Sequence, residues 1–251
     1  MFMTNSNATE PKVVSRDQWL IARKALLKQE KDLTHRRDAL AEERQRMPWV
    51  KIEKPYTFDT PGGKQSLSDL FGDRSQLFVY HLMMGPEWTD ACPSCSMAAD
   101  GFSANLPHLQ QHDVSFVAVS RAPQSQIDAF KKRMGWKFNW VSSAGSDFNR
   151  DFKVHFTDDE LKRDDIYNFG TAGFPVQEAP GASVFAKDAA GDVFHTYSTY
   201  GRGLEELLGV YVFLDRLPKG RDEAGLPMPM AWVKHHDRYD AASKAHACCG
   251  S

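Results

Sequence analysis

Apolar residues first form a regular pattern over residues 15–46. Neither Gly nor Pro interrupts this stretch, Ser15 can cap its start and Pro48 follows its end, so we predict one long helix. Its apolar residues recur every seven positions and share one face: Trp19, Leu26, Leu33 and Leu40. Arginines at the remaining heptad positions make a weak coiled-coil seam. We expect this face to pack on the chain's own domain or to form a homodimer with a second copy.

The middle of the chain alternates apolar runs with helical periodicity. Three apolar runs predict buried strands at residues 76–84, 114–120 and 138–142. Between them, helical spacing of apolar residues predicts helices at 94–111 and 124–134. This alternation is typical of βαβ units and therefore of an α/β fold.

The following residues complete this domain. An irregular insertion at 145–180 precedes a hairpin of strands at 182–187 and 193–199, and a helix is predicted at 204–217. We therefore divide the chain into three parts: an N-terminal helical extension (1–48), a central α/β domain (49–217) and an extended C-terminal tail (218–251).

Composition narrows the class of protein. The 251 residues suffice for one large core, and 41% hydrophobic with 25% charged residues exclude disorder and a coiled-coil rod. With 31 basic and 33 acidic side chains the formal charge is −2, which argues against a general nucleic-acid binder. The longest apolar run, at 77–84, is too short to span a membrane, and residues 1–12 show no secretory signal. We expect a cytoplasmic protein without nucleic-acid or membrane partners.

The motif that carries chemistry is a C-x-x-C formed by Cys92 and Cys95. Its place between a buried strand and a helix inside a βαβ unit is typical of a thioredoxin-like redox centre. Backbone N–H groups and the positive dipole end at a helix start stabilise a thiolate, so Cys92 is the predicted nucleophile. Cys95, one turn later, can attack a mixed disulfide on Cys92. The sequence predicts exchange with protein or small-molecule disulfides and thiols, without a cofactor.

Two other interpretations of the pair remain open. It can be half of a zinc site, in which case the chain is a non-enzymatic metal-binding or scaffold protein that uses the same thiols, or it can be two inert buried thiols. Further zinc ligands would have to come from the tail: His235, His236, His246, Cys248 and Cys249. The position inside a βαβ unit favours the redox interpretation, and we predict no metal site.

The adjacent Cys248 and Cys249 form a second cysteine cluster. A disulfide between neighbouring residues is strained, so we treat them as separate thiols. We expect them to have no role; a redox relay to Cys92 and the binding of a soft metal are the alternatives.

Longer motifs accompany the cysteine pair. They are Gly85-Pro86-x-Trp88, Ser120-Arg121-Ala122-Pro123, Arg133-Met134-Gly135-Trp136, Ser146-Asp147-Phe148-Asn149 and His195-Thr196-Tyr197-Ser198-Thr199-Tyr200. With them, residues 14–239 resemble the bacterial thioredoxin-like family of predicted dithiol-disulfide oxidoreductases, domain of unknown function 899. The resemblance implies a thioredoxin-like fold, a redox centre at the cysteine pair and a helical N-terminal extension.

The surroundings of the pair differ from those in thioredoxin. Ala91 rather than Trp precedes Cys92, and Trp88, further back, is a candidate wall of a substrate groove. Thioredoxin also has a cis-proline that faces its dithiol before the hairpin, and Pro180 is our candidate for this residue. We expect His81, in the strand that feeds the loop, to be a hydrogen-bonded core residue.

A partial resemblance to peroxiredoxins provides an alternative enzyme. Their motif P-x-x-x-[TS]-x-x-C and a distant Arg orient peroxide at the thiolate. Thr89 has the matching distance to Cys92, but Pro86 is one position too close, and neither Arg121 nor Arg202 stands out as the arginine. A thiol peroxidase using Cys92 is therefore the second hypothesis, and Thr89 is a candidate substrate contact.

Overall fold

The computed structural model describes residues 12–239, and α1 (Arg16–Gln45) confirms the predicted long helix. Ser15 caps this helix. Its Oγ accepts a hydrogen bond from the Gln18 backbone N–H at 3.3 Å, and the Gln18 side chain accepts one from the Ser15 N–H at 3.2 Å. This reciprocal capping box fixes the first turn. The apolar residues spaced by seven are exposed, and their pairing with a second copy stays a prediction.

Eight strands of the described chain form one mixed sheet in the order β1-β8-β7-β4-β5-β6-β2-β3. Their bounds are Val50–Lys51 (β1), Thr57–Thr60 (β2), Gly63–Ser66 (β3), Gln76–His81 (β4), Val114–Ser120 (β5), Asn139–Ser142 (β6), Gly181–Lys187 (β7) and Val193–Tyr200 (β8). β4, β5 and β6 are parallel neighbours, whereas β7 runs antiparallel to both β4 and β8. The five strands predicted from apolar patterns are confirmed.

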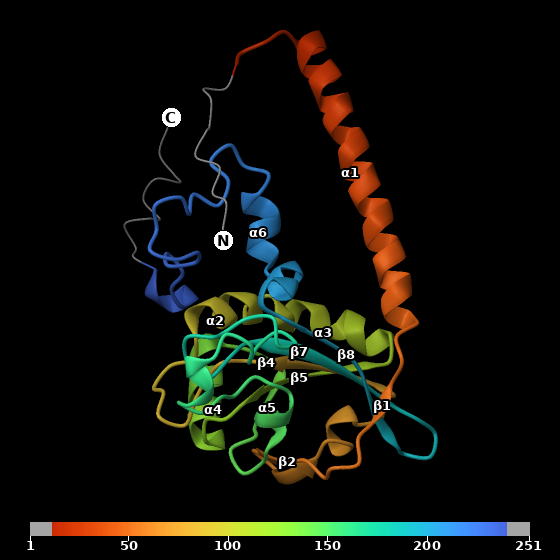
Figure 1. Ribbon diagram of the computed structural model, residues 1–251, viewed down its shortest axis with the longest axis vertical. Helices are drawn as coiled ribbons and strands as arrows, with labels where there is room; N and C mark the ends of the chain where they lie inside the picture. The colour runs from red at the N-terminus through yellow and green to blue at the C-terminus, as the bar shows by residue number, and fades with distance from the viewer. Residues whose placement is uncertain (1–11, 240–251) are drawn as a thin grey trace. The chain divides into compact units, whose positions relative to one another are not determined.

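Alternating side chains of the central strands separate two cores on opposite faces of the sheet. On β4, Leu77 and Val79 belong to one core and Tyr80 to the other. The short α5 (Phe148–Asp151) contributes to the core of Leu77 and Val79. Three helices, labelled in Figure 1, cover the face of the sheet on which Tyr80 lies: α2 (Pro93–Ala99), α3 (Phe102–Gln111) and α4 (Gln124–Met134). Each of them contributes buried side chains to the core of Tyr80.

The order and direction of these elements define the fold. Three parallel strands are joined by helices on one face and flanked by an antiparallel pair. This is a thioredoxin-like α/β arrangement, as predicted. Among the described helices, none combines the length and the apolar character needed to cross a lipid bilayer.

Two predicted helices are interrupted near a glycine. The helix predicted at 94–111 is divided into α2 and α3, since Asp100 ends the first and Gly101 precedes the second. The helix predicted at 204–217 begins as a 3₁₀ helix, Gly201–Leu207, and continues as α6 (Gly209–Leu214). Glycine in a helix costs about 1 kcal/mol relative to alanine, which favours a break at these positions. The helix that starts at the cysteine pair is therefore short.

His81 is a buried, hydrogen-bonded core residue, as predicted. Its Nε2 lies 2.9 Å from the Ser183 Oγ, which lies 2.9 Å from the Ser198 Oγ. The His195 Nε2 approaches the same Ser198 Oγ at 2.8 Å. Burial lowers the pKa of His81 from 6.5 to about 3, so this imidazole is neutral at neutral pH. The polar chain links β4, β7 and β8.

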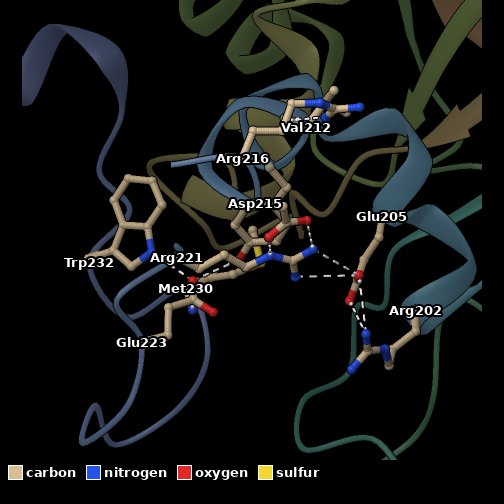
Figure 2. Close-up of polar contacts among 10 residues, drawn as sticks. Arg202, Glu205, Val212, Asp215, Arg216, Arg221, Glu223, Met230 and Trp232 are labelled. Atoms are coloured by element: carbon tan, nitrogen blue, oxygen red, sulfur yellow. Dashed lines mark hydrogen bonds and ion pairs between the residues drawn. The ribbon is translucent and has the colours of Figure 1, made fainter. Parts of the chain in front are cut away.

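Two sets of hydrogen bonds to carboxylates fix the residues that follow α6. Arg221 donates to Asp215 at 2.7 Å and to Glu205 at 3.4 Å, and Figure 2 shows its guanidinium between them. The Glu223 Oε1 accepts a hydrogen bond from the Trp232 Nε1 at 2.7 Å. The described part of the predicted tail is therefore irregular in secondary structure but fixed by specific contacts.

Candidate dithiol active site

The cysteine pair lies where the loop after β4 enters α2. Cys92 is the N-cap residue of α2, and Pro93 follows at the first helical position, where a missing N–H costs nothing. The Cys92 N–H donates to the Met83 carbonyl at 2.9 Å, which ties the helix start to the segment that directly follows β4. The Ser96 N–H donates to the Cys92 carbonyl at 2.9 Å and closes the first turn. The predicted placement of Cys92 at a helix N-terminus is confirmed.

Cys92 and Cys95 are free thiols that differ in exposure. Cys92 is partly exposed, whereas Cys95 is 3% exposed. The hydrogen bond from the Cys95 thiol has the largest effect on the pKa of Cys92. Together with the N–H groups of Cys95 and Ser94 it outweighs the effect of burial, so the pKa of Cys92 falls from 9.0 to about 6. Cys92 is therefore mainly a thiolate at neutral pH, in the form that acts as a nucleophile.

Cys95 has the opposite character. Its hydrogen bond to Cys92 and its burial raise the pKa of Cys95 well above 9.0, while the Met83 backbone and the Tyr80 hydroxyl act to lower this pKa. Tyr80 is 3% exposed and lies in the same core as Cys95. It was not among the candidates from sequence, although strand alternation places it on the face covered by α2. Cys95 therefore stays a protonated thiol, and the Tyr80 hydroxyl lies beside it.

Alkylation of Cys92 should follow a titration with a midpoint near pH 6, because the thiolate is the reactive form. Cys95→Ala removes the S–H donor and should raise the midpoint by about one pH unit or more. Cys95→Ser keeps an O–H donor and should leave the midpoint near the parental value. Rates of iodoacetamide labelling against pH, measured on the Cys92 peptide by mass spectrometry, check this. Identical midpoints in the parent and Cys95→Ala would contradict it.

Trp88 packs against the loop that leads to Cys92. A Cβ on Gly85 would lie 3.1 Å from the Trp88 Nε1 and 3.4 Å from the Glu178 Cγ, so this backbone position must stay small. The half-buried Trp88 ring and Cys92 both pack against the core of Tyr80. Binding of substrate by Trp88 stays a prediction.

Thr89 and Pro180 were predicted to contact substrate. Thr89 is exposed. Every peptide bond within residues 12–239 is trans, so the prediction that Pro180 is a cis-proline is wrong. Backbone contacts on both sides hold this segment: the Ala179 N–H donates to the Val154 carbonyl at 3.0 Å, and the Tyr167 hydroxyl donates to the Pro180 carbonyl at 2.6 Å. Substrate contacts of Thr89 and Pro180 stay predictions.

The arginines considered for a peroxide site have carboxylate partners. The Arg121 Nη1 lies 2.7 Å from the Glu178 Oε1 and 2.8 Å from the His155 Nδ1, and the Glu178 side chain is 4% exposed. Arg202 donates to Glu205 at 3.2 Å. A cavity of about 430 Å³ is lined in part by Arg121 and His155. Arg121 is therefore paired with a buried carboxylate, and it gives the peroxidase hypothesis no support.

Within residues 12–239, no three His, Cys, Asp or Glu side chains are placed to share a metal ion. The His235 Nε2 lies 2.8 Å from the Ala91 carbonyl oxygen, and the His236 Nδ1 lies 2.7 Å from an Asp100 carboxylate oxygen. These two histidines are therefore engaged with the loop and helix around the cysteine pair. The other proposed ligands lie outside the described residues: His246, Cys248 and Cys249.

The fold and the site together define a thioredoxin-like protein with a closely spaced cysteine pair. The model of the family described as "Bacterial protein of unknown function (DUF899)" matches residues 8–239. The chain therefore belongs to this family, as its motifs predict. No curated protein matches the chain.

Several solved structures of peroxiredoxins are similar to this chain at low identity. Peroxiredoxin Q of Xanthomonas campestris is 18% identical and covers 65% of this chain and 91% of its own, with a TM-score of 0.44. Peroxidoxin BcpB of Mycobacterium tuberculosis is 14% identical, with coverages of 65% and 94% and a TM-score of 0.42. The reduced 2-Cys peroxiredoxin of Plasmodium vivax is 15% identical, with coverages of 65% and 90% and a TM-score of 0.39.

Proposed function

We propose that the chain is a thiol–disulfide oxidoreductase whose dithiol is Cys92 and Cys95. The observation that carries the proposal is the asymmetry of the pair. A partly exposed Cys92 with a lowered pKa stands one helical turn before a buried Cys95 with a raised pKa. The first thiol can meet a disulfide from outside, and the second is placed to attack the sulfur in front of it.

The reaction proceeds in two exchanges. The Cys92 thiolate attacks one substrate sulfur, the substrate S–S bond breaks, and the other substrate sulfur leaves as a thiolate that takes up a proton. The Cys95 sulfur then attacks the Cys92 sulfur, and its proton passes to the departing substrate thiolate. The Cys92–Cys95 disulfide closes, and two electrons have moved from the dithiol to the substrate.

The Tyr80 hydroxyl assists the second exchange by stabilising negative charge on Cys95, since it acts to lower the pKa of that thiol. Tyr80→Phe keeps the ring in the core and should slow closure of the Cys92–Cys95 disulfide by about tenfold, because a hydrogen bond to an ionised group contributes about 1.5–3 kcal/mol. Acid quenching followed by mass spectrometry should show the mixed disulfide with substrate accumulating.

Tyr211→Phe is the matched control for this variant. Tyr211 is also buried, but its hydroxyl donates to Glu223 at 2.8 Å. Its removal should leave the lifetime of the mixed disulfide unchanged. A mixed disulfide that decays equally fast in the parent and in Tyr80→Phe would exclude the role of Tyr80.

The substrates we propose are protein or small-molecule disulfides that approach Cys92 past Trp88, Thr89 and Pro180. The two cysteine thiols supply both electrons that reduce the substrate, so the proposed reaction has no cofactor. Thiols of the cytoplasm would restore the dithiol, and neither nucleic acid nor a membrane takes part.

A redox titration of the purified protein tests the proposed function. The Cys92–Cys95 disulfide should form and open reversibly as the ratio of reduced to oxidised dithiothreitol changes, and peptide mapping should place it within one chain. A pair that stays reduced over the whole range, or oxidises irreversibly, would exclude the proposal.

Hydrogen peroxide should be consumed slowly by this protein. The peroxidase motif is displaced at Pro86, and Arg121 is engaged by Glu178. A coupled peroxide-consumption assay on the parent and Thr89→Val measures this, and equal, slow rates are expected. Rapid turnover that Thr89→Val removes would instead support the thiol peroxidase.

A further inference from the structure

The cavity of about 430 Å³ beside Arg121 lies at the carboxyl ends of two parallel strands. Its lining includes Arg121, which directly follows β5, and three residues that follow β6: Asp147, Arg150 and His155. The loop that carries Cys92 follows β4, the parallel neighbour of β5. Ligands of open α/β sheets bind outside this edge, in sites of about 300–1,000 Å³. The cavity therefore has the place and the size of a small-molecule site.

Arg121 has hydrogen-bond donors that the protein does not use. Its Nη1 donates to the Glu178 carboxylate at 2.7 Å and to the His155 Nδ1 at 2.8 Å. Within residues 12–239 its Nε and Nη2 have no hydrogen-bond partner, and neither nitrogen is fully buried. This edge of a guanidinium binds a carboxylate through two parallel hydrogen bonds. Because the His155 Nδ1 accepts from Arg121, the proton of that ring lies on Nε2, which is a further donor.

Arg150 adds a positive charge to the cavity. Its side chain is 48% exposed, and its one ion pair within the described residues is a loose one, at 3.6 Å to Glu160. Asp147 also lines the cavity, but its carboxylate accepts a hydrogen bond from the Lys54 Nζ at 2.8 Å. The lining therefore favours an anionic ligand, and Arg150 is the cation most accessible to it.

Backbone hydrogen bonds place Arg121 close to the dithiol. The Cys92 N–H donates to the Met83 carbonyl at 2.9 Å. The Ala122 N–H, directly after Arg121, donates to the carbonyl of the next residue, Met84, at 2.9 Å. Neighbouring hydrogen-bonded backbones lie about 5 Å apart, so two such spacings separate Cys92 and Arg121 by roughly 10 Å. A carboxylate two residues' length from a disulfide sulfur, about 7 Å, can meet the Arg121 side chain while the sulfur meets Cys92.

We propose that this cavity binds a carboxylate of the substrate while Cys92 attacks the substrate disulfide. The inference rests on the proposed function and names its substrate class: small-molecule disulfides that carry a carboxylate about two residues' length from a sulfur. The carboxylate accepts two hydrogen bonds from the Nε and Nη2 of Arg121 and is attracted by Arg150. Glu178 holds the guanidinium in place from the other side.

Binding is tested apart from exchange with S-methylglutathione, which has carboxylates but neither a thiol nor a disulfide. Isothermal titration calorimetry should show that it binds the parent. Arg121→Lys keeps a charge beside Glu178 but loses the paired donors, and should weaken binding about tenfold. Arg150→Gln should weaken it about threefold, as expected for an exposed ion pair. No binding to the parent, or equal affinities in the parent and both variants, would overturn the proposal.

Arg163→Gln is the matched control for Arg150→Gln. It removes the same charge from an exposed arginine that is paired with Asp165 and lies outside the lining of this cavity. Its affinity for S-methylglutathione should equal that of the parent. A loss of affinity equal to that of Arg150→Gln would mean that net charge alone, rather than the cavity, attracts the ligand.

Turnover separates the substrate class from the proposed function. With oxidised glutathione, Arg150→Gln should raise KM about threefold and leave kcat and the pH profile of Cys92 labelling unchanged. With 2-hydroxyethyl disulfide, which has no carboxylate, the parent and Arg150→Gln should have the same KM. A KM that rises equally for both disulfides would exclude the carboxylate site alone. No turnover of either disulfide by the parent would exclude the proposed function, whereas calorimetry would still decide whether the cavity binds carboxylates.

Discussion

Cys92→Ser should reduce disulfide exchange by this protein to the rate seen without protein, and Cys95→Ser should stop exchange after one event. A serine hydroxyl is not ionised at neutral pH, so the first variant has no nucleophile at the start of α2. In the second variant, the new hydroxyl still donates to Cys92, which forms a mixed disulfide that nothing behind it can resolve.

Two measurements distinguish these outcomes. The release of a chromophoric thiol from a model disulfide gives the turnover, and intact-mass spectrometry counts the substrate adducts on Cys95→Ser. We expect one adduct per chain, placed on Cys92 by peptide mapping. Ser103→Ala, a helix α3 change away from the pair, serves as the control and should turn over at the parental rate. Parental rates in both cysteine variants would show that exchange takes place elsewhere.

Phe148→Ala should lower the free energy of unfolding by about 3–5 kcal/mol, the range for a fully buried aromatic residue. Phe148 is 0% exposed, and its ring centroid lies 4.9 Å from that of Phe58 and 4.6 Å from that of Phe152. Its removal leaves a cavity in the core opposite the dithiol. Urea unfolding followed by fluorescence measures the change.

Phe213→Ala is the matched control, since the same atoms are removed from a side chain that is 72% exposed. It should change the free energy of unfolding by no more than about 0.5 kcal/mol. Equal effects of the two substitutions would mean that the core around Phe148 contributes little to stability.

Apolar periodicity was sufficient to predict the elements that position the dithiol. Buried strands such as β4 and β5 are nearly continuous apolar runs, and the long α1 has seven-residue spacing with a capping residue at its start. The β2–β3 hairpin escaped this reasoning because its strands are four residues each and mostly polar. The break at Gly101 escaped it because one glycine is compatible with either one helix or two.

The site could be predicted only in part, because a sequence pattern reports on residues that are close together along the chain. The roles of Cys92 and Cys95 follow from two positions close in sequence, and the helix start between them is a local feature. The contact of His235 with Ala91 joins residues separated by 144 positions, which no local pattern encodes. Pro180 is the opposite case. The resemblance to thioredoxin suggested a cis peptide bond before this residue, whereas the bond is trans here.

The outer strands of the sheet have a consequence for self-association. At one edge β1 has only two residues, and Lys51 within it is paired with Asp192. At the other edge β3 carries Lys64 among small and polar residues. Short strands and lysines at sheet edges disfavour the backbone pairing through which exposed strands join other chains into extended sheets. Neither edge therefore offers a template for aggregation, even though the sheet is open at both sides.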